Sequence, residues 1–105
     1  VRYVLNSAVL TNPGVYRYEL MSREQAAAWI RQGSFASRVG YPATAQHIAA
    51  LGGVPVPISR EPHRMEIGDE ALVVRLRYRL DNPAAKGLVE PKEEDWEYGL
   101  LVREQ

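Results

Sequence analysis

The sequence predicts a single α/β domain in which a small mixed β-sheet is flanked by helices. Its 105 residues suffice for one domain, and its 46% hydrophobic and 25% charged content is ordinary for a globular protein. Strand-like and helix-like segments alternate along the chain, which is typical of a sheet covered by helices. The sequence contains no repeat, linker or low-complexity segment. We therefore expect residues 1–105 to form one domain.

The predicted strands are apolar or β-branched runs bounded by turn residues. They cover residues 2–10, 15–20, 35–39, 60–65, 70–80 and 96–102. The strand at 70–80 has the clearest pattern, because leucine, valine and tyrosine side chains fall on one of its faces. The turn sequence Thr11-Asn12-Pro13-Gly14 separates the first two strands and predicts that they pair as a hairpin.

Two helices are predicted between the strands. Ser22 and Gln25 form a capping box at the start of the first helix, and Gly33 ends it. The second helix begins at Pro42, whose missing N–H costs nothing in the first turn, and ends at Gly52-Gly53. The buried faces comprise Ala26, Trp29 and Ile30 in the first helix and Ala45, Ile48 and Ala49 in the second. The expected order is β-β-α-β-α-β-β-β.

Composition narrows the classes of function. The chain has no cysteine, which excludes disulfides, zinc ribbons and thiol catalysis. It has no apolar run near the ~18 residues of a membrane helix and no secretory signal, so we expect a cytoplasmic protein. The formal net charge is zero, whereas a general nucleic-acid binder usually has a larger basic excess. The spacing of histidines and carboxylates predicts no metal site and no cofactor.

Eleven of the thirteen basic residues are arginines, and Arg75, Arg77 and Arg79 share one face of the strand predicted at 70–80. Unpaired arginines are too costly to bury, so this face is expected to meet water, acids or a polyanion. One interpretation is a solvated face with cross-strand pairs to glutamates such as Glu97. The other is a phosphate-binding surface, because the guanidinium fork matches phosphate oxygens.

The stretch from Gly40 to Thr44 directs the start of the second helix outward, where N–H groups and the helix dipole favour anions. Tyr41 and Pro42 also fit a plain hydrophobic lead-in to the helix. His47 falls beside the buried face of this helix, so a structural role is predicted for it.

Four segments together resemble the small viral and bacterial ring nucleases, which include type III anti-CRISPR proteins. They are LNSAVLTNPGVYRYE, SRVGYPATAQHIAALGGVPVPISR, GDEALVVRLRYRL and WEYGLLVRE, and they span nearly the whole chain. The resemblance implies a homodimer with cyclic tetra-adenylate in a groove across its two-fold axis. It also implies metal-independent cleavage, in which a ribose 2′-hydroxyl attacks its own phosphate while a histidine protonates the departing 5′-oxygen.

The resemblance assigns roles to particular residues. Arg60 matches an arginine that grips the ligand, and Arg79 matches the arginine at the scissile phosphate. Ser7 and Asn12 fall in the ligand-lining segment, whereas His63 and Arg75 occupy ligand-lining positions without matching the usual residue types. Gly40 and Thr44 flank the start of the second helix, where they would contact the ligand.

Tyr41 departs from the family pattern, because the family has a histidine after the glycine that corresponds to Gly40. A tyrosine hydroxyl, with an ordinary pKa of about 10, donates a proton at neutral pH less readily than imidazole, with a pKa of about 6.5. The catalytic candidates are therefore Tyr41, Arg79 and His63, and both slow cleavage and pure sequestration stay open. Two other classes also stay open: a small DNA- or RNA-binding regulator that uses the Arg75, Arg77 and Arg79 face, and an adaptor without a ligand.

Overall fold

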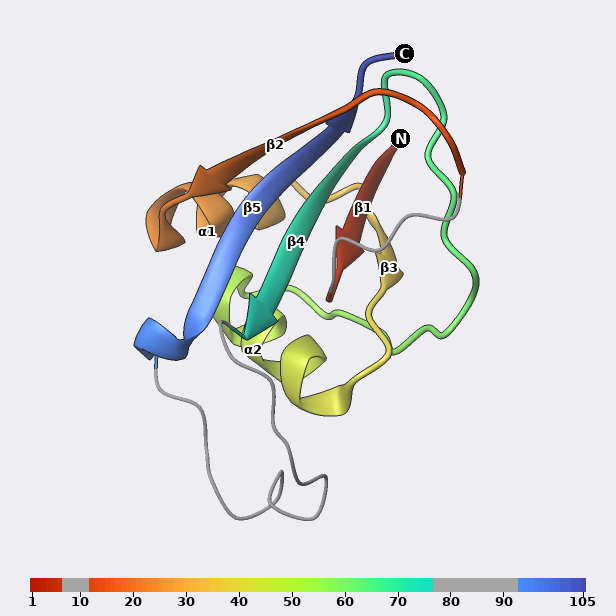
Figure 1. Ribbon diagram of the computed structural model, residues 1–105. Coiled ribbons are helices and arrows are strands. Elements are labelled where there is room, and N and C mark those ends of the chain that lie inside the picture. Colours follow the sequence, from red (N-terminus) through yellow and green to blue (C-terminus); the bar gives the residue numbers. More distant parts are fainter. Residues whose placement is uncertain (7–11, 77–92) are drawn as a thin grey trace.

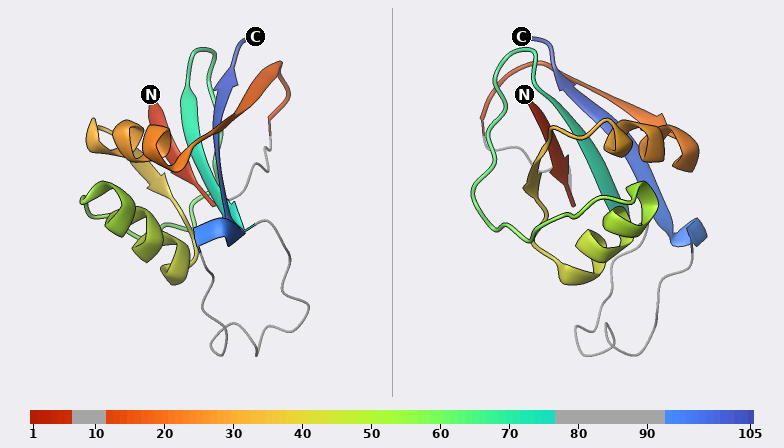
Figure 2. Two further views of the ribbon diagram at one scale, coloured as in Figure 1. Left: turned by 90° about the vertical axis from the view of Figure 1, so that its left-hand side faces the viewer. Right: turned by 180° about the vertical axis from the view of Figure 1, so that it is seen from behind.

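The computed structural model describes residues 1–6, 12–76 and 93–105. They form a five-stranded mixed sheet, and its two helices lie on the same side (Figures 1 and 2). In chain order the elements are β1 (Arg2–Leu5), β2 (Tyr16–Met21), α1 (Arg23–Arg31), β3 (Ala36–Arg38), α2 (Pro42–Gly52), β4 (Glu70–Leu76), the short 3-10 helix η2 (Glu93–Asp95) and β5 (Trp96–Arg103). This confirms the predicted fold class.

The strand order is β2-β5-β4-β1-β3, with β1 parallel to both β3 and β4. The predicted hairpin between the first two strands is wrong, because β2 pairs antiparallel with β5, from Tyr16 opposite Arg103 to Met21 opposite Tyr98. Both edges of β1 are already occupied by parallel partners, so β2 extends the sheet at β5. A turn sequence specifies a change of direction and leaves the partner open.

The strand predicted at residues 60–65 is also wrong. This part of the chain belongs to an irregular strap, residues 54–69, whose single bridge to a strand end joins Ile58 to Val39. His63 and Met65 are buried while Arg64 and Glu66 are exposed, so the strap reproduces a strand-like alternation without a ladder of hydrogen bonds. The predicted strands at 2–10 and 70–80 are described only as far as Asn6 and Leu76.

Apolar side chains fill both faces of the sheet. The helix side buries a large cluster that includes Val4, Ile30, Ile48, Leu72, Val74 and Trp96. On the opposite side, a smaller cluster comprises Leu5, Met65, Ala71, Val73 and Leu101. The strand β4 is therefore buried on both faces over most of its length, as central strands are.

The helix ends agree with the sequence signals. Ser22 Oγ accepts a hydrogen bond from the Gln25 N–H at 3.1 Å, and Gln25 Oε1 accepts one from the Ser22 N–H at 2.9 Å, which completes the capping box. Gly53 ends α2 in the left-handed region at φ 70°, a conformation that glycine adopts without strain. No helix of the described residues is long and apolar enough to span a bilayer.

Candidate functional site

The candidate site lies where the parallel strands β1 and β3 end. In open α/β sheets, ligands bind in the crevice beyond the carboxyl ends of the strands. Asn6 follows β1, Gly40 lies two residues after β3, and α2 begins at Pro42, so this edge of the sheet brings three chain segments together (Figure 1). The Gly40 N–H donates a hydrogen bond to Asn6 Oδ1 at 3.3 Å and links two of these segments directly.

Gly40, Tyr41 and Arg60 line an open hollow of about 360 Å³ at this edge. Arg60 comes from the strap, and its Nε donates a hydrogen bond to the Gly40 carbonyl at 3.3 Å. Within the described ranges no carboxylate forms an ion pair with Arg60. The guanidinium is exposed and keeps its positive charge available at the rim of the hollow.

The beginning of α2 adds hydrogen-bond donors to the same place. Tyr41 is its N-cap residue, and the tyrosine side chain makes no capping hydrogen bond. The first turn carries no acidic residue that would offset the positive end of the helix dipole. A helix start of this kind, next to an unneutralised guanidinium, favours an anion. Tyr41 is 51% exposed beside these groups, whereas Thr44 is buried in the same first turn.

Arg75 lies on the sheet face opposite the helices and is neutralised there. Its Nε forms an ion pair of 2.6 Å with Glu97 Oε2 on the neighbouring strand. Tyr18 donates a second hydrogen bond to the same carboxylate oxygen at 3.4 Å. The solvated-face interpretation is thus confirmed for Arg75. Arg77 and Arg79 fall outside the described residues.

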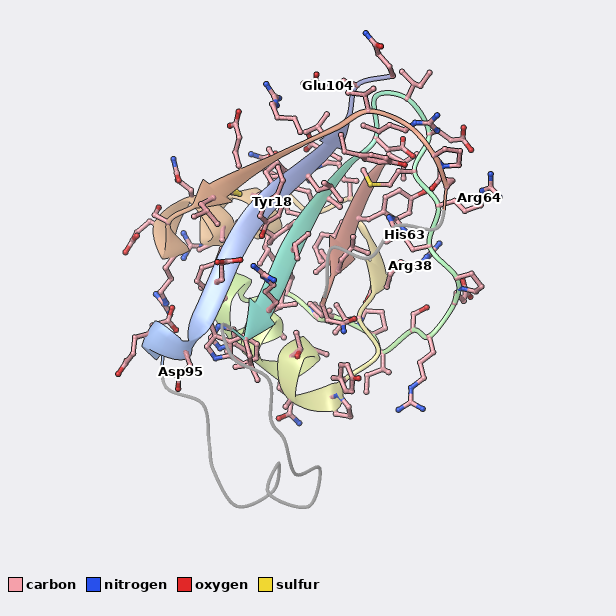
Figure 3. The ribbon with its side chains drawn as sticks, in the orientation of Figure 1. Tyr18, Arg38, His63, Arg64, Asp95 and Glu104 are labelled. Carbon is pink, nitrogen blue, oxygen red and sulfur yellow. The ribbon has the colours of Figure 1, made fainter. Side chains whose placement is uncertain are left out.

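Asn12 and His63 do not line the hollow: Asn12 is bonded to the strap, and His63 belongs to it. Both polar atoms of the Asn12 carboxamide bond to the backbone of Met65: Nδ2 donates to the carbonyl at 2.8 Å, and Oδ1 accepts from the N–H at 3.3 Å. His63 is buried with its ring edge against Tyr3, at 4.5 Å between ring centroids. Burial, and then the charge of Arg38, lower the pKa of His63. Figure 3 shows His63 and Arg38 side by side, with Arg64 turned outward.

His47 has the structural role that its position predicted. Its ring stacks on Trp96 at 4.2 Å, and its Nε2 lies 2.7 Å from the Tyr98 hydroxyl. Because Tyr98 donates its single proton to Glu93 at 2.7 Å, Nε2 of His47 is the donor to Tyr98. Burial lowers the pKa of His47, while the charge of Glu93 partly opposes that shift.

The structure thus brings together three of the predicted site residues: Gly40, Tyr41 and Arg60. The prediction for Ser7, like that for Arg79, falls outside the described residues. Sequence reasoning missed Asn6, because the first strand was expected to continue to residue 10 and Asn6 would then have lain inside it. A polar residue directly after a buried apolar run was the signal that marked the end of β1. Among the described residues, no three histidine, aspartate or glutamate side chains gather as metal ligands would.

These features define a small α/β protein with a cationic hollow at the carboxyl ends of its parallel strands. The chain matches the model of the STIV B116-like family over residues 2–97 and belongs to that family. The structure is similar to that of B116 of Sulfolobus turreted icosahedral virus, with a TM-score of 0.72, 14% identity, and coverage of 97% of this chain and 98% of that chain. At this identity the likeness shows the fold alone.

Relatives by sequence come from viruses and from a bacterium. ORF117 of Acidianus two-tailed virus is 32% identical over 85 residues, which cover 76% of this chain and 73% of that protein. Protein 26 of Sulfolobus islandicus filamentous virus is 31% identical over 96 residues, which cover 88% of this chain and 81% of that protein. YddF of Bacillus subtilis is 32% identical over 62 residues, which cover 57% of each chain.

Proposed function

We propose that this protein binds cyclic oligoadenylate, with cyclic tetra-adenylate as the favoured ring, and thereby shuts off type III CRISPR signalling in the cytoplasm. The observation that carries the proposal is the hollow between Gly40, Tyr41 and Arg60. Arg60 offers an unneutralised guanidinium there, and the uncapped start of α2 offers backbone N–H groups. Together they suit one phosphate group.

The symmetry of the ligand is the second part of the proposed binding mode. A ring of four nucleotides has two-fold symmetry, so two copies of the chain can contact it identically across a dimer axis. The resemblance to ring nucleases supports this arrangement. A zero net charge and the pairing of Arg75 with Glu97 favour a small anion over a long nucleic acid.

The residue at position 41 sets the rate at which a bound ring would be cleaved. In the cleavage that the resemblance implies, the 2′-hydroxyl oxygen forms a bond to the phosphorus attached to the 3′-oxygen of the same ribose, and its proton passes to water. The bond from phosphorus to the 5′-oxygen breaks, and that oxygen takes up a proton. Loss of a general acid typically slows such a step by about 10²- to 10⁴-fold. With tyrosine in place of histidine, the protein either sequesters the ring or opens it slowly.

The binding test uses calorimetric titration with cyclic tetra-adenylate and, separately, cyclic hexa-adenylate. We expect the intact protein to bind the tetra-adenylate and Arg60→Ala to weaken binding by about tenfold or more, because a charge-assisted hydrogen bond is lost. Arg17→Ala is the matched control, since it removes an exposed arginine from β2, at the opposite edge of the sheet from β3. No binding at micromolar ligand would refute the proposed function.

The cleavage test separates products by chromatography after long incubation. We expect little or no linear product from the intact protein. Tyr41→His should raise the rate by about 10²-fold or more, because it restores an imidazole donor beside the guanidinium. An unchanged rate in that variant would show that position 41 does not deliver the proton.

A further inference from the structure

We infer that Asn6 is a positioning residue, which holds Gly40 and through it sets the guanidinium of Arg60 for phosphate binding; the inference rests on the proposed function. Gly40 is held on both sides. Its N–H donates to Asn6 Oδ1 at 3.3 Å, and its carbonyl accepts from Arg60 Nε at 3.3 Å. A chain of two hydrogen bonds therefore joins the end of β1 to the strap.

The sheet itself does not hold Gly40 in place. The strand β3 has three residues, and its pairing with β1 ends at Leu5 opposite Arg38. Val39 then turns to the strap, where it bridges to Ile58. The ladder of backbone hydrogen bonds between β1 and β3 stops before Gly40. The Asn6 carboxamide, directly after β1, accepts the hydrogen bond of the Gly40 N–H instead.

Gly40 also makes room for the arginine. A Cβ atom on residue 40 would lie 3.4 Å from Arg60 Cγ and 4.0 Å from Nε, so a methyl group would already touch the arginine stem. A glycine at this position allows the stem to lie against the backbone and Nε to reach the carbonyl.

This arrangement prepares Arg60 for a ligand. With Nε bonded to the Gly40 carbonyl, the orientation of the guanidinium is restricted, and its terminal nitrogens can still donate to phosphate oxygens. An unanchored arginine would lose rotamer freedom when the ligand binds, which weakens binding by about three- to tenfold per ordered side chain. By holding Gly40, Asn6 helps to order the Arg60 side chain in the folded protein before the ligand binds, so less rotamer freedom is lost on binding.

A double-mutant cycle tests whether Asn6 acts through Arg60. Calorimetric titration with cyclic tetra-adenylate would compare the intact protein, Asn6→Ala, Arg60→Ala and the double variant. We expect Asn6→Ala to weaken binding by about three- to tenfold when Arg60 is present. In the Arg60→Ala background the same change should cost less than about twofold. An equal loss in both backgrounds would overturn the inference.

A second readout needs no ligand and therefore separates this inference from the proposed function. In ¹⁵N-labelled protein, the Arg60 Nε–H resonance, identified by its loss in Arg60→Lys, should exchange slowly with water. We expect faster exchange in Asn6→Ala and slow exchange in Asn6→Asp, which keeps the acceptor. Unchanged exchange in Asn6→Ala would refute the positioning role even if the ring binds. Asn6→Leu, of similar shape but without an acceptor, replaces Asn6→Ala if that variant does not fold.

Discussion

The two histidines illustrate how single side chains are tuned by their surroundings. His63, a residue of the strap, packs against Tyr3 and feels the positive charge of Arg38, while His47 stacks on Trp96 and bonds to Tyr98. Burial disfavours the charged imidazolium in both places and lowers both pKa values. The folded protein therefore holds both rings neutral to a lower pH than the unfolded chain does.

Acidification should consequently destabilise the protein. Below the unfolded pKa of about 6.5, the unfolded chain binds protons that the folded chain does not, so the free energy of unfolding falls with pH. The slope is at most about 1.4 kcal/mol per pH unit for each histidine. Urea unfolding at pH 7.5, 6.5 and 5.5 measures this change in the free energy of unfolding. The dependence on pH should be weaker in His63→Gln than in the intact protein. A slope in His63→Gln as steep as in the intact protein would contradict this account of His63.

At the scale of elements, α1 and α2 approach each other closely because Gly52 has no side chain. A Cβ atom on Gly52 would lie 2.3 Å from Cγ2 of Ile30 and 2.8 Å from its Cβ. Ile30 is fully buried in the helix-side cluster and has little space to move. The glycine at the end of α2 therefore sets the separation of the two helices.

Gly52→Ala should accordingly lower the free energy of unfolding by about 1–3 kcal/mol, the usual cost of an overfilled core. Gln46→Ala, on the exposed face of the same helix, is the control and should change it by less than about 0.5 kcal/mol. Urea unfolding of both variants gives the comparison. A Gly52→Ala variant as stable as the control would show that the helices are not packed this tightly.

At the scale of the whole molecule, the proposed ligand needs more than one chain. Cyclic tetra-adenylate has four phosphates, and one hollow offers a single described guanidinium and a single helix start. A second copy related by a two-fold axis doubles both groups. The proposed groove thus belongs to a pair of chains.

Sedimentation equilibrium at micromolar protein should therefore give a mass about twice the 11.8 kDa of one chain. Arg60→Ala should sediment as the intact protein does, because that variant is meant to remove a ligand contact and not a subunit contact. A monomer both with and without cyclic tetra-adenylate would rule out a groove shared by two chains, while leaving binding by a single chain to the calorimetric test.

The local features of this fold could be predicted from the sequence. Ser22 and Gln25 cap α1, Gly53 ends α2, and the apolar pattern from residue 70 predicts the strand β4. Each of these depends on residues a few positions apart, so the signal is complete within a short segment. Gly40, Tyr41 and Arg60 were also singled out from the sequence, although their meeting in one hollow was not.

Tertiary structure alone decided which segments meet. The pairing of β2 with β5 joins residues far apart in the chain, and so do the hydrogen bonds between Asn6 and Gly40 and between Asn12 and Met65. The strap in place of a strand at 60–65 also depends on such distant contacts. A strand pattern or a polar side chain determines the kind of group that a residue can pair with. It does not determine which segment of the chain supplies that group. That choice depends on which sheet edges and backbone groups the rest of the fold leaves available, because buried backbone N–H and C=O groups must find partners.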